Sequence, residues 1–369
     1  MFFEQISAEM IFFFILYGIT GAIPLIAAVY LLFRRGNAFS PDVTPPLRLR
    51  RWASAFFAVS ALAHVWWILF FIYSNDLQSV RYVVVVMVDC VALLTTMAGT
   101  LLAMLQDRRR PVWPIFAAMV PFVILGVLQI LFPETSFIRM ATIYILTVYV
   151  VFSVYMVFAV RRYGRWLNDN YADLENKKVW LIQLVSLVCL LLFILYILVD
   201  NIILFYVLHV IELVLFGLLL WRVETLPELP TQELQVPAIP ANINLAQIER
   251  LLAEHCVATE LYRQHDLTLQ QLAQSVGTNR FYLSQYFSRQ GITYNIYINN
   301  LRINHFISLY HEAIQAGNSI VAQELASDSG YRSYSTFSLA FKQRMGQSVT
   351  VWMRDTIGDN GSSLQKTTI

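Results

Sequence analysis

Two groups of side chains near the C-terminal end have the chemistry needed to read double-stranded DNA. Arginine, lysine, amide and hydroxyl groups bond to base edges and phosphates, and apolar groups contact thymine methyl groups. The first group consists of Asn279, Arg280, Phe281, Ser284 and Gln285. The second group consists of Arg332, Ser333, Tyr334, Thr336 and Lys342. We predict that these residues contact DNA, with the two arginines at base edges and Lys342 at a phosphate.

Each group lies inside a sequence pattern that occurs twice. The first copy is Ala273, Gly277, Leu283, Phe287, Gly291, Thr293 and Tyr297. The second copy is Ala326, Gly330, Phe337, Phe341, Gly346, Ser348 and Trp352. The small residue, the glycine and the apolar pair are typical of two helices joined by a tight turn, because glycine accepts the left-handed backbone there. The pattern predicts two helix-turn-helix units, with Thr278 or Asn279 capping one recognition helix and Ser333 or Ser335 capping the other.

Residues 241–354 resemble the DNA-binding domain of AraC-family transcription regulators. The resemblance rests on the repeat and on Leu301, Arg302 and Ile303, which match the Leu-Arg-Ile/Leu of that family's linker helix. It implies two helix-turn-helix units joined by one long helix over residues 293–310, with promoter DNA as partner. It also implies transcription activation and contact with RNA polymerase. Gln285 and Leu339 replace an arginine often found in each recognition helix.

The rest of the chain is strongly apolar. Hydrophobic residues make up 57% of the sequence and charged residues 14%, whereas a soluble domain carries about 25% charged residues. Seven stretches reach the roughly 20 residues that a helix needs to cross a bilayer. They are residues 10–33, 52–74, 82–105, 113–132, 137–160, 180–199 and 202–220. The alternative is a soluble protein with buried helices, but these runs have no polar faces. The predicted fold class is all-α, a seven-helix transmembrane bundle followed by an AraC-like tandem helix-turn-helix domain.

Basic residues between the predicted spans set their orientation. Fourteen Arg and Lys residues follow spans one, three, five and seven, whereas only Arg81 and Arg139 lie at the opposite ends. Connections rich in basic residues stay in the cytoplasm. We therefore predict an outside N-terminus and a cytoplasmic DNA-binding domain on a multi-pass protein of the bacterial inner membrane. Because the outer connections are short, any signal is read inside the bundle, from the lipid or from a membrane partner.

Four polar residues inside the predicted spans are candidates for intramembrane sensing. They are His64, Asp89, His209 and Glu212. At 1.5 Å per residue they fall roughly 10 to 17 Å below the outer ends of their spans, so they could share one layer. Ionisable groups at that depth usually face the bundle interior. Two readings stay open, a ligand- or proton-sensing site and a structural network of interhelical hydrogen bonds.

The sequence divides into four expected parts. They are a transmembrane domain at 1–221, a proline-rich cytoplasmic linker at 222–244, the DNA-binding domain at 245–356 and a flexible tail at 357–369. No nucleotide-binding, HExxH or nucleophile-elbow motif is present, and the three cysteines are scattered. We therefore predict no enzyme activity, no catalytic residue, no metal and no cofactor.

The sequence thus predicts a membrane-tethered, sequence-specific transcription regulator, with the bundle as signal sensor or anchor. The expected partners are double-stranded DNA at promoter sites, the lipid bilayer, RNA polymerase, a second copy in a homodimer and a signal ligand or membrane partner of unknown identity. The alternative is a seven-helix transporter or receptor with a regulatory helical C-terminal domain. DNA binding by the C-terminal domain discriminates the two.

Overall fold

The computed structural model describes residues 8–73, 80–133, 136–174, 177–198, 202–229, 245–317 and 321–356. Over these residues the chain is helical and contains no β-strand, which confirms the predicted fold class. It separates into two compact units. Unit 1 comprises Met1–Tyr163 and Val179–Thr231, and unit 2 comprises Gly164–Lys178 and Gln232–Ile369.

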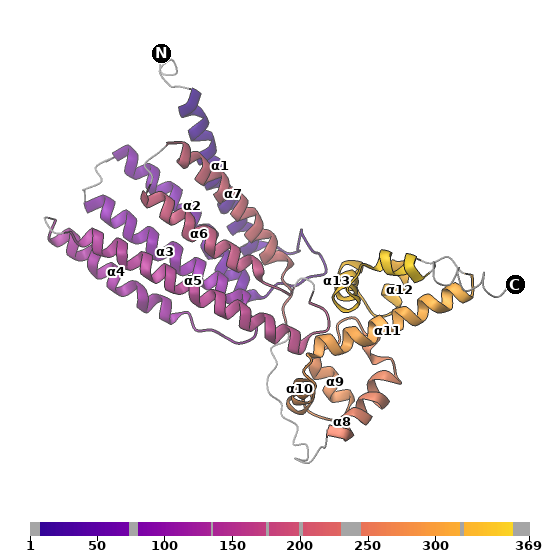
Figure 1. Cartoon of the computed structure of the whole chain (residues 1–369). Helices are drawn as coiled ribbons and strands as arrows, with labels where there is room; N and C mark the ends of the chain where they lie inside the picture. Colours follow the sequence, from indigo (N-terminus) through magenta and orange to yellow (C-terminus); the bar gives the residue numbers. More distant parts are fainter. Residues whose placement is uncertain are drawn as a thin grey trace. The chain divides into compact units, whose positions relative to one another are not determined.

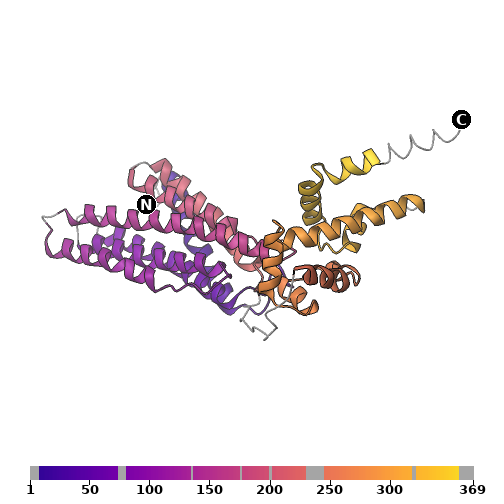
Figure 2. The same cartoon turned by 60° about the horizontal axis from the view of Figure 1, so that its bottom comes forward.

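Over the described residues, unit 1 consists of seven helices, which run alongside one another (Figures 1 and 2). They are α1 (Ala8–Phe33), α2 (Leu47–Tyr73), α3 (Val80–Met104), α4 (Trp113–Leu131), α5 (Phe137–Asn170), α6 (Trp180–Leu198) and α7 (Ile202–Thr225). Each coincides with one of the predicted apolar stretches. Helix α5 is the exception in length, because it continues well past the stretch 137–160 and its last residues belong to unit 2.

Six of these helices are long and apolar enough, by length and composition, to cross a membrane. In α6 the apolar part with described side chains is Trp180–Cys189, so its crossing stays a prediction. The turn predicted at residues 200–201 lies outside the described residues. The helices approach closely where glycine faces a large side chain, as Gly99 of α3 does with the Trp52 ring of α2. Their outer faces expose many large apolar side chains, Ile26 and Phe158 among them.

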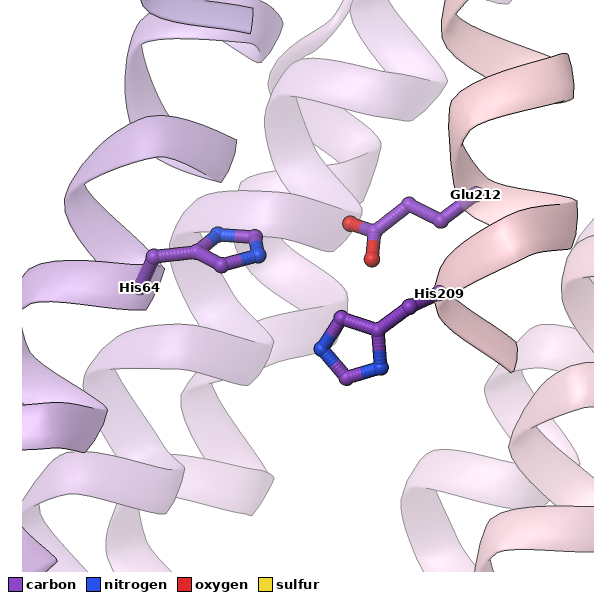
Figure 3. A group of neighbouring side chains, drawn as sticks. All are labelled: His64, His209 and Glu212. Atoms are coloured by element: carbon purple, nitrogen blue, oxygen red, sulfur yellow. The ribbon is translucent and has the colours of Figure 1, made fainter. Parts of the chain in front are cut away.

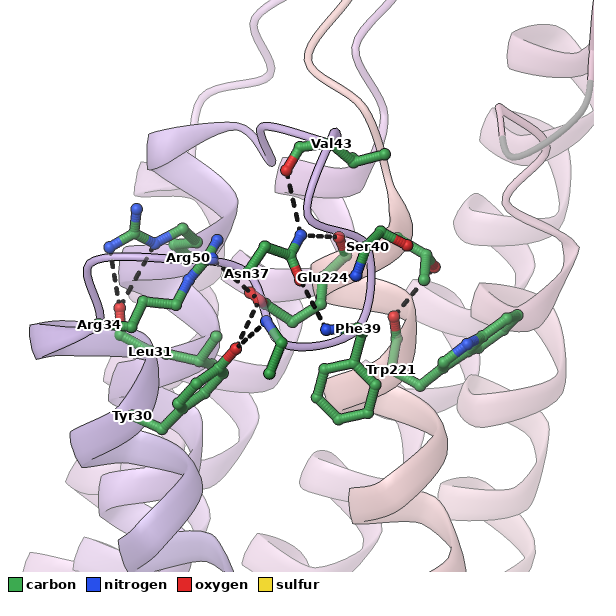
Figure 4. A network of polar contacts seen from close by, with 12 residues as sticks. Tyr30, Leu31, Arg34, Asn37, Phe39, Ser40, Val43, Arg50, Trp221 and Glu224 are labelled. Carbon is green, nitrogen blue, oxygen red and sulfur yellow. Dashed lines mark hydrogen bonds and ion pairs between the residues drawn. The ribbon is translucent and has the colours of Figure 1, made fainter.

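The C-terminal end of α7 is linked to the end of α1 and the residues after it by a polar network (Figure 4). The buried carboxylate of Glu224 pairs with Arg34 at 3.2 Å and accepts a hydrogen bond from the Tyr30 hydroxyl at 3.1 Å. The Asn37 amide donates to the Glu224 carbonyl at 2.8 Å. Beyond α7, Leu229 is buried and its N–H donates to Gln106 Oε1. The first residues of the expected linker therefore pack on unit 1, whereas residues 230–244 and the tail at 357–369 lie outside the described residues.

Unit 2 is built from short helices around one long one. They are α8 (Leu245–Leu252), a π-helical turn (Ala253–Val257), a 3-10 turn (Leu261–Arg263), α9 (Leu269–Ser275), α10 (Arg280–Arg289), α11 (Tyr294–Gln315), α12 (Ala322–Asp328) and α13 (Tyr334–Met345). Residues 349–356 are also helical. Helix α11 contributes Ile298 to an apolar core with α8, α9 and α10, and Phe306 to a second core with α12 and α13. The predicted linker helix is thereby confirmed as the element that joins two small cores.

Candidate functional site

The first helix-turn-helix consists of α9, a turn at Gly277 and α10. Gly277 has φ +71°, the left-handed conformation that its place in the repeat predicted. The Asn279 side chain accepts a hydrogen bond from the Tyr282 N–H, so Asn279 is the N-cap. Leu283 and Phe287 are buried and hold α10 on its core.

The second helix-turn-helix repeats this construction with α12, Gly330 and α13. Gly330 has φ +98°, and the Ser333 side chain accepts from the Thr336 N–H as the N-cap. Phe337 and Phe341 are both fully buried against α11. Asn279 and Ser333, both predicted to contact DNA, therefore also begin the recognition helices.

The opposite faces of the recognition helices are open to solvent. On α10, Phe281 is 64% exposed, Gln285 is exposed and Ser284 is half-buried. On α13, Tyr334 and Lys342 are exposed, together with Leu339, and Thr336 is half-buried. Each helix thus presents a solvent-facing stripe of polar and aromatic groups, joined on α13 by the apolar Leu339, that can enter a major groove.

The two predicted base-reading arginines have different surroundings. Arg332 is largely exposed and lies 3.6 Å from the Asp266 carboxylate, a weak contact that DNA can displace. Arg280 is half-buried beside Asp169, in the last turn of α5, and Tyr171, which follows that helix. Burial lowers the pKa of Arg280, while the neighbouring Tyr171 and Asp169 raise it.

The end of α5 and the residues after it are part of the folded DNA-binding unit, which the sequence did not indicate. Ala172 belongs to the first core, and Asn295 of α11 donates to the Tyr171 and Ala172 carbonyls at 3.1 and 2.6 Å. Tyr171 also forms an isolated antiparallel bridge with Thr268, the N-cap of α9. No periodicity could reveal these contacts, since they join residues about a hundred or more positions apart.

Arg302 holds the two halves of unit 2 together. Its guanidinium is 1% exposed and donates to the Tyr262 and Gln264 carbonyls, each at 2.7 Å. It also lies over the Tyr331 ring of the second helix-turn-helix at 5.4 Å. The sequence singled out Arg302 as a motif position but did not show that its role is internal. Arg344 of α13 donates to Asn300 and Asn304 of α11, each at 2.6 Å, so this exposed arginine also braces the fold.

In the bundle, three of the four polar candidates come together (Figure 3). His64 of α2 faces His209 and Glu212, which are three residues apart and therefore on one face of α7. One nitrogen of each ring and one carboxylate oxygen lie within 4.8 Å of one another. Asp89 of α3 is not in this group, and its carboxylate accepts from the Trp67 indole N–H at 3.2 Å. Depth along the spans indicated a shared layer but not which side chains would meet.

Comparison with known proteins bears on unit 2. Residues 272–355 match the family model described as a helix-turn-helix domain. The matched range contains both copies of the repeated pattern and supports an AraC-type DNA-binding domain. No curated protein and no solved structure gave a significant match.

Proposed function

We propose that this protein is a membrane-tethered, sequence-specific transcription regulator, and an activator as the AraC-like domain implies. One observation carries the proposal: two capped recognition helices share α11 in a chain that also holds a bundle of apolar helices. Two recognition helices let one chain contact two successive stretches of major groove, so a homodimer is not needed for two-part recognition. Contact with RNA polymerase follows from the activator role.

The membrane location is supported by the outer faces of α1 to α7. Soluble proteins rarely expose contiguous apolar patches beyond a few hundred square ångströms. Here large apolar side chains are exposed along the helices, with Ile26 at 67% and Ile143 at 66%. Burying these faces in lipid removes the cost of exposing apolar side chains to water. The excess of basic residues after spans one, three, five and seven favours a cytoplasmic DNA-binding unit.

In this proposal, helix α5 transmits the signal, because it runs without a break from the bundle into unit 2. Helix α5 is continuous from Phe137 to Asn170, and the residues after it join the first core of unit 2. A change in the bundle that moves the end of α5 would act on Tyr171, Ala172 and the neighbouring Arg280. Sensing by the bundle then requires no domain outside the membrane.

The orientation predicts the outcome of reporter fusions. A reporter that is active only outside the cytoplasm should be active when fused after Asn75 or Glu134. It should be inactive after Gly36, Asn168 or Thr231. Fluorescent fusions with the opposite compartment preference serve as the control on expression. Outside activity at Thr231 would contradict the proposal, because the helix-turn-helix units could not reach DNA.

DNA binding is tested with the full-length protein in lipid nanodiscs and fragmented genomic DNA. We expect selected sites in which one chain protects two short clusters of base pairs about one helical turn, or roughly 34–36 Å, apart. Unit 2 between residues 241 and 357 carries nine basic against eight acidic residues. Non-specific affinity should therefore be modest, and most discrimination should come from bases. Absence of any selected sequence would favour the transporter or receptor alternative.

Two substitutions in the second unit separate base contacts from phosphate contacts. Arg332→Ala should cost about 1–3 kcal/mol on the matched site and relax base preference in one cluster. Lys342→Ala should lower the affinity for matched and scrambled sites by the same factor. It should also reduce the slope of log affinity against log salt concentration by about one. Both side chains are exposed, so folding is unaffected. If Arg332→Ala lowers the affinity for matched and scrambled sites equally, Arg332 does not contact a base.

A further inference from the structure

The polar group inside the bundle has the composition of a metal-ligand set. Two imidazole rings and one carboxylate converge from two helices, with their ligand atoms within 4.8 Å of one another (Figure 3). In a tetrahedral zinc site with bonds of about 2.0–2.1 Å, ligand atoms are about 3.3 Å apart. The observed spacing exceeds this value by at most about 1.5 Å, a difference on the scale of a side-chain rotation.

We propose that His64, His209 and Glu212 form a binding site for a divalent transition metal ion of the zinc class. His64 supplies Nε2, His209 a ring nitrogen and Glu212 a carboxylate oxygen. Three protein ligands leave the fourth position to water or a small ligand, unlike closed structural zinc sites with four protein ligands. Imidazole favours Zn²⁺, Cu²⁺, Ni²⁺ and Fe²⁺ over the hard cations Mg²⁺ and Ca²⁺.

The hydrogen bonds of His64 prepare Nε2 for a metal. Nδ1 lies 2.8 Å from the Ser60 carbonyl, which can only accept, so Nδ1 carries the proton. Nε2 then has the lone pair, and it points to Thr20 Oγ1 at 3.0 Å. The Thr20 hydroxyl can instead donate to the Leu16 or Tyr17 carbonyl, which releases Nε2 for coordination. A backbone carbonyl on the second ring nitrogen is the arrangement that orients metal-binding histidines.

The negative charges of two nearby carboxylates also favour a cation at the proposed metal site. The Glu212 carboxylate is close enough to Asp89 for their charges to interact. The sequence of α2 carries no Lys or Arg between Arg51 and its end, and α7 carries none before Arg222. A divalent ion would neutralise the two carboxylates where apolar surroundings make uncompensated charge costly.

The proposed metal site does not depend on whether the protein binds DNA. The idea that the bound metal is the signal rests on the proposed function. The competing account is a proton-sharing or purely structural network of the same side chains. The two differ in whether the purified protein takes up a metal at these residues.

The test is metal binding by the full-length protein, purified with a histidine-free affinity tag and stripped with a chelator. On reloading with Zn²⁺ we expect about one ion per chain by mass spectrometry, and Co²⁺ should give the intense visible absorption of tetrahedral sites. His64→Gln, His209→Gln and Glu212→Gln should each lower Zn²⁺ affinity by more than about a hundredfold. Thr20→Val removes a hydroxyl that competes for Nε2 and removes no ligand, so this variant should bind Zn²⁺ at least as tightly as the unchanged protein.

Controls separate this site from adventitious binding and from misfolding. His255→Gln and His311→Gln, both exposed in unit 2, should bind Zn²⁺ like the unchanged protein. Zn²⁺ should raise the melting temperature of the unchanged protein and not that of the ligand variants, whose metal-free melting shows that they are folded. Equal Zn²⁺ content in the unchanged protein and the three ligand variants, or no uptake by either, would overturn the proposal. If binding is confirmed but DNA binding is absent, only the signalling role fails.

Discussion

Gly330→Ala is expected to unfold the second helix-turn-helix and abolish specific DNA binding. Gly330 has φ +98°, and a Cβ there would lie 2.6 Å from the Arg263 Cα and 2.7 Å from its carbonyl oxygen. Both neighbours are backbone atoms, so no side-chain rotation relieves the contact. The left-handed backbone costs about 1–2 kcal/mol and the overpacking about 1–3 kcal/mol, giving about 3 kcal/mol or more together.

The measurement is hydrogen exchange by mass spectrometry on the full-length protein. A loss of about 3 kcal/mol should accelerate exchange in α12 and α13 by roughly a hundredfold. Gly277→Ala is the matched control, because it occupies the same place in the first unit at φ +71° with nothing within 4 Å of the added Cβ. Gly277→Ala should lose only the about 1–2 kcal/mol that a left-handed backbone costs a non-glycine residue. Equal effects of the two substitutions would show that the contact with Arg263 does not limit packing.

Arg302→Met is expected to destabilise both cores of unit 2. The guanidinium donates to the carbonyls of Tyr262 and Gln264, and more distantly to that of His265 at 3.3 Å. Burial lowers the pKa of Arg302, and the nearby Tyr331 and Tyr294 raise it. Methionine fills much of the space but leaves the buried Tyr262 carbonyl without this donor, at about 1–3 kcal/mol, and removes the charged hydrogen bond to Gln264, at about 1.5–3 kcal/mol. The total expected loss is therefore about 3 kcal/mol or more.

Hydrogen exchange distinguishes this effect from a local one, since α9 and α12 should both lose protection. Arg302→Lys should rescue little, because an ammonium group cannot match the planar fork that reaches the separate carbonyls. Arg344→Met is the control, an arginine that also donates to backbone and side-chain oxygens of neighbouring residues but is exposed. Its loss should stay below about 1 kcal/mol. Protection lost in α12 alone would contradict the bridging role of Arg302.

The positions of the helices could be predicted from the sequence because interactions between residues close along the chain determine them. Apolar runs of bilayer length predicted α1 to α7, and the repeated glycines at 277 and 330 marked turns that need a left-handed backbone. Asn279 and Ser333 begin their helices because a short oxygen-bearing side chain satisfies an otherwise unpaired N–H. These features depend on neighbours within a few residues, so one sequence suffices to find them.

Contacts between distant segments were decided only by the tertiary structure. Residue spacing along the predicted spans indicated the depth of His64, Asp89, His209 and Glu212, but not the rotation of each helix about its axis. That rotation brings His64 to His209 and Glu212 and leaves Asp89 with Trp67. The residues after α5 join the DNA-binding unit, and Arg302 is buried as a donor to another loop, because side chains there find complementary surfaces far away along the chain.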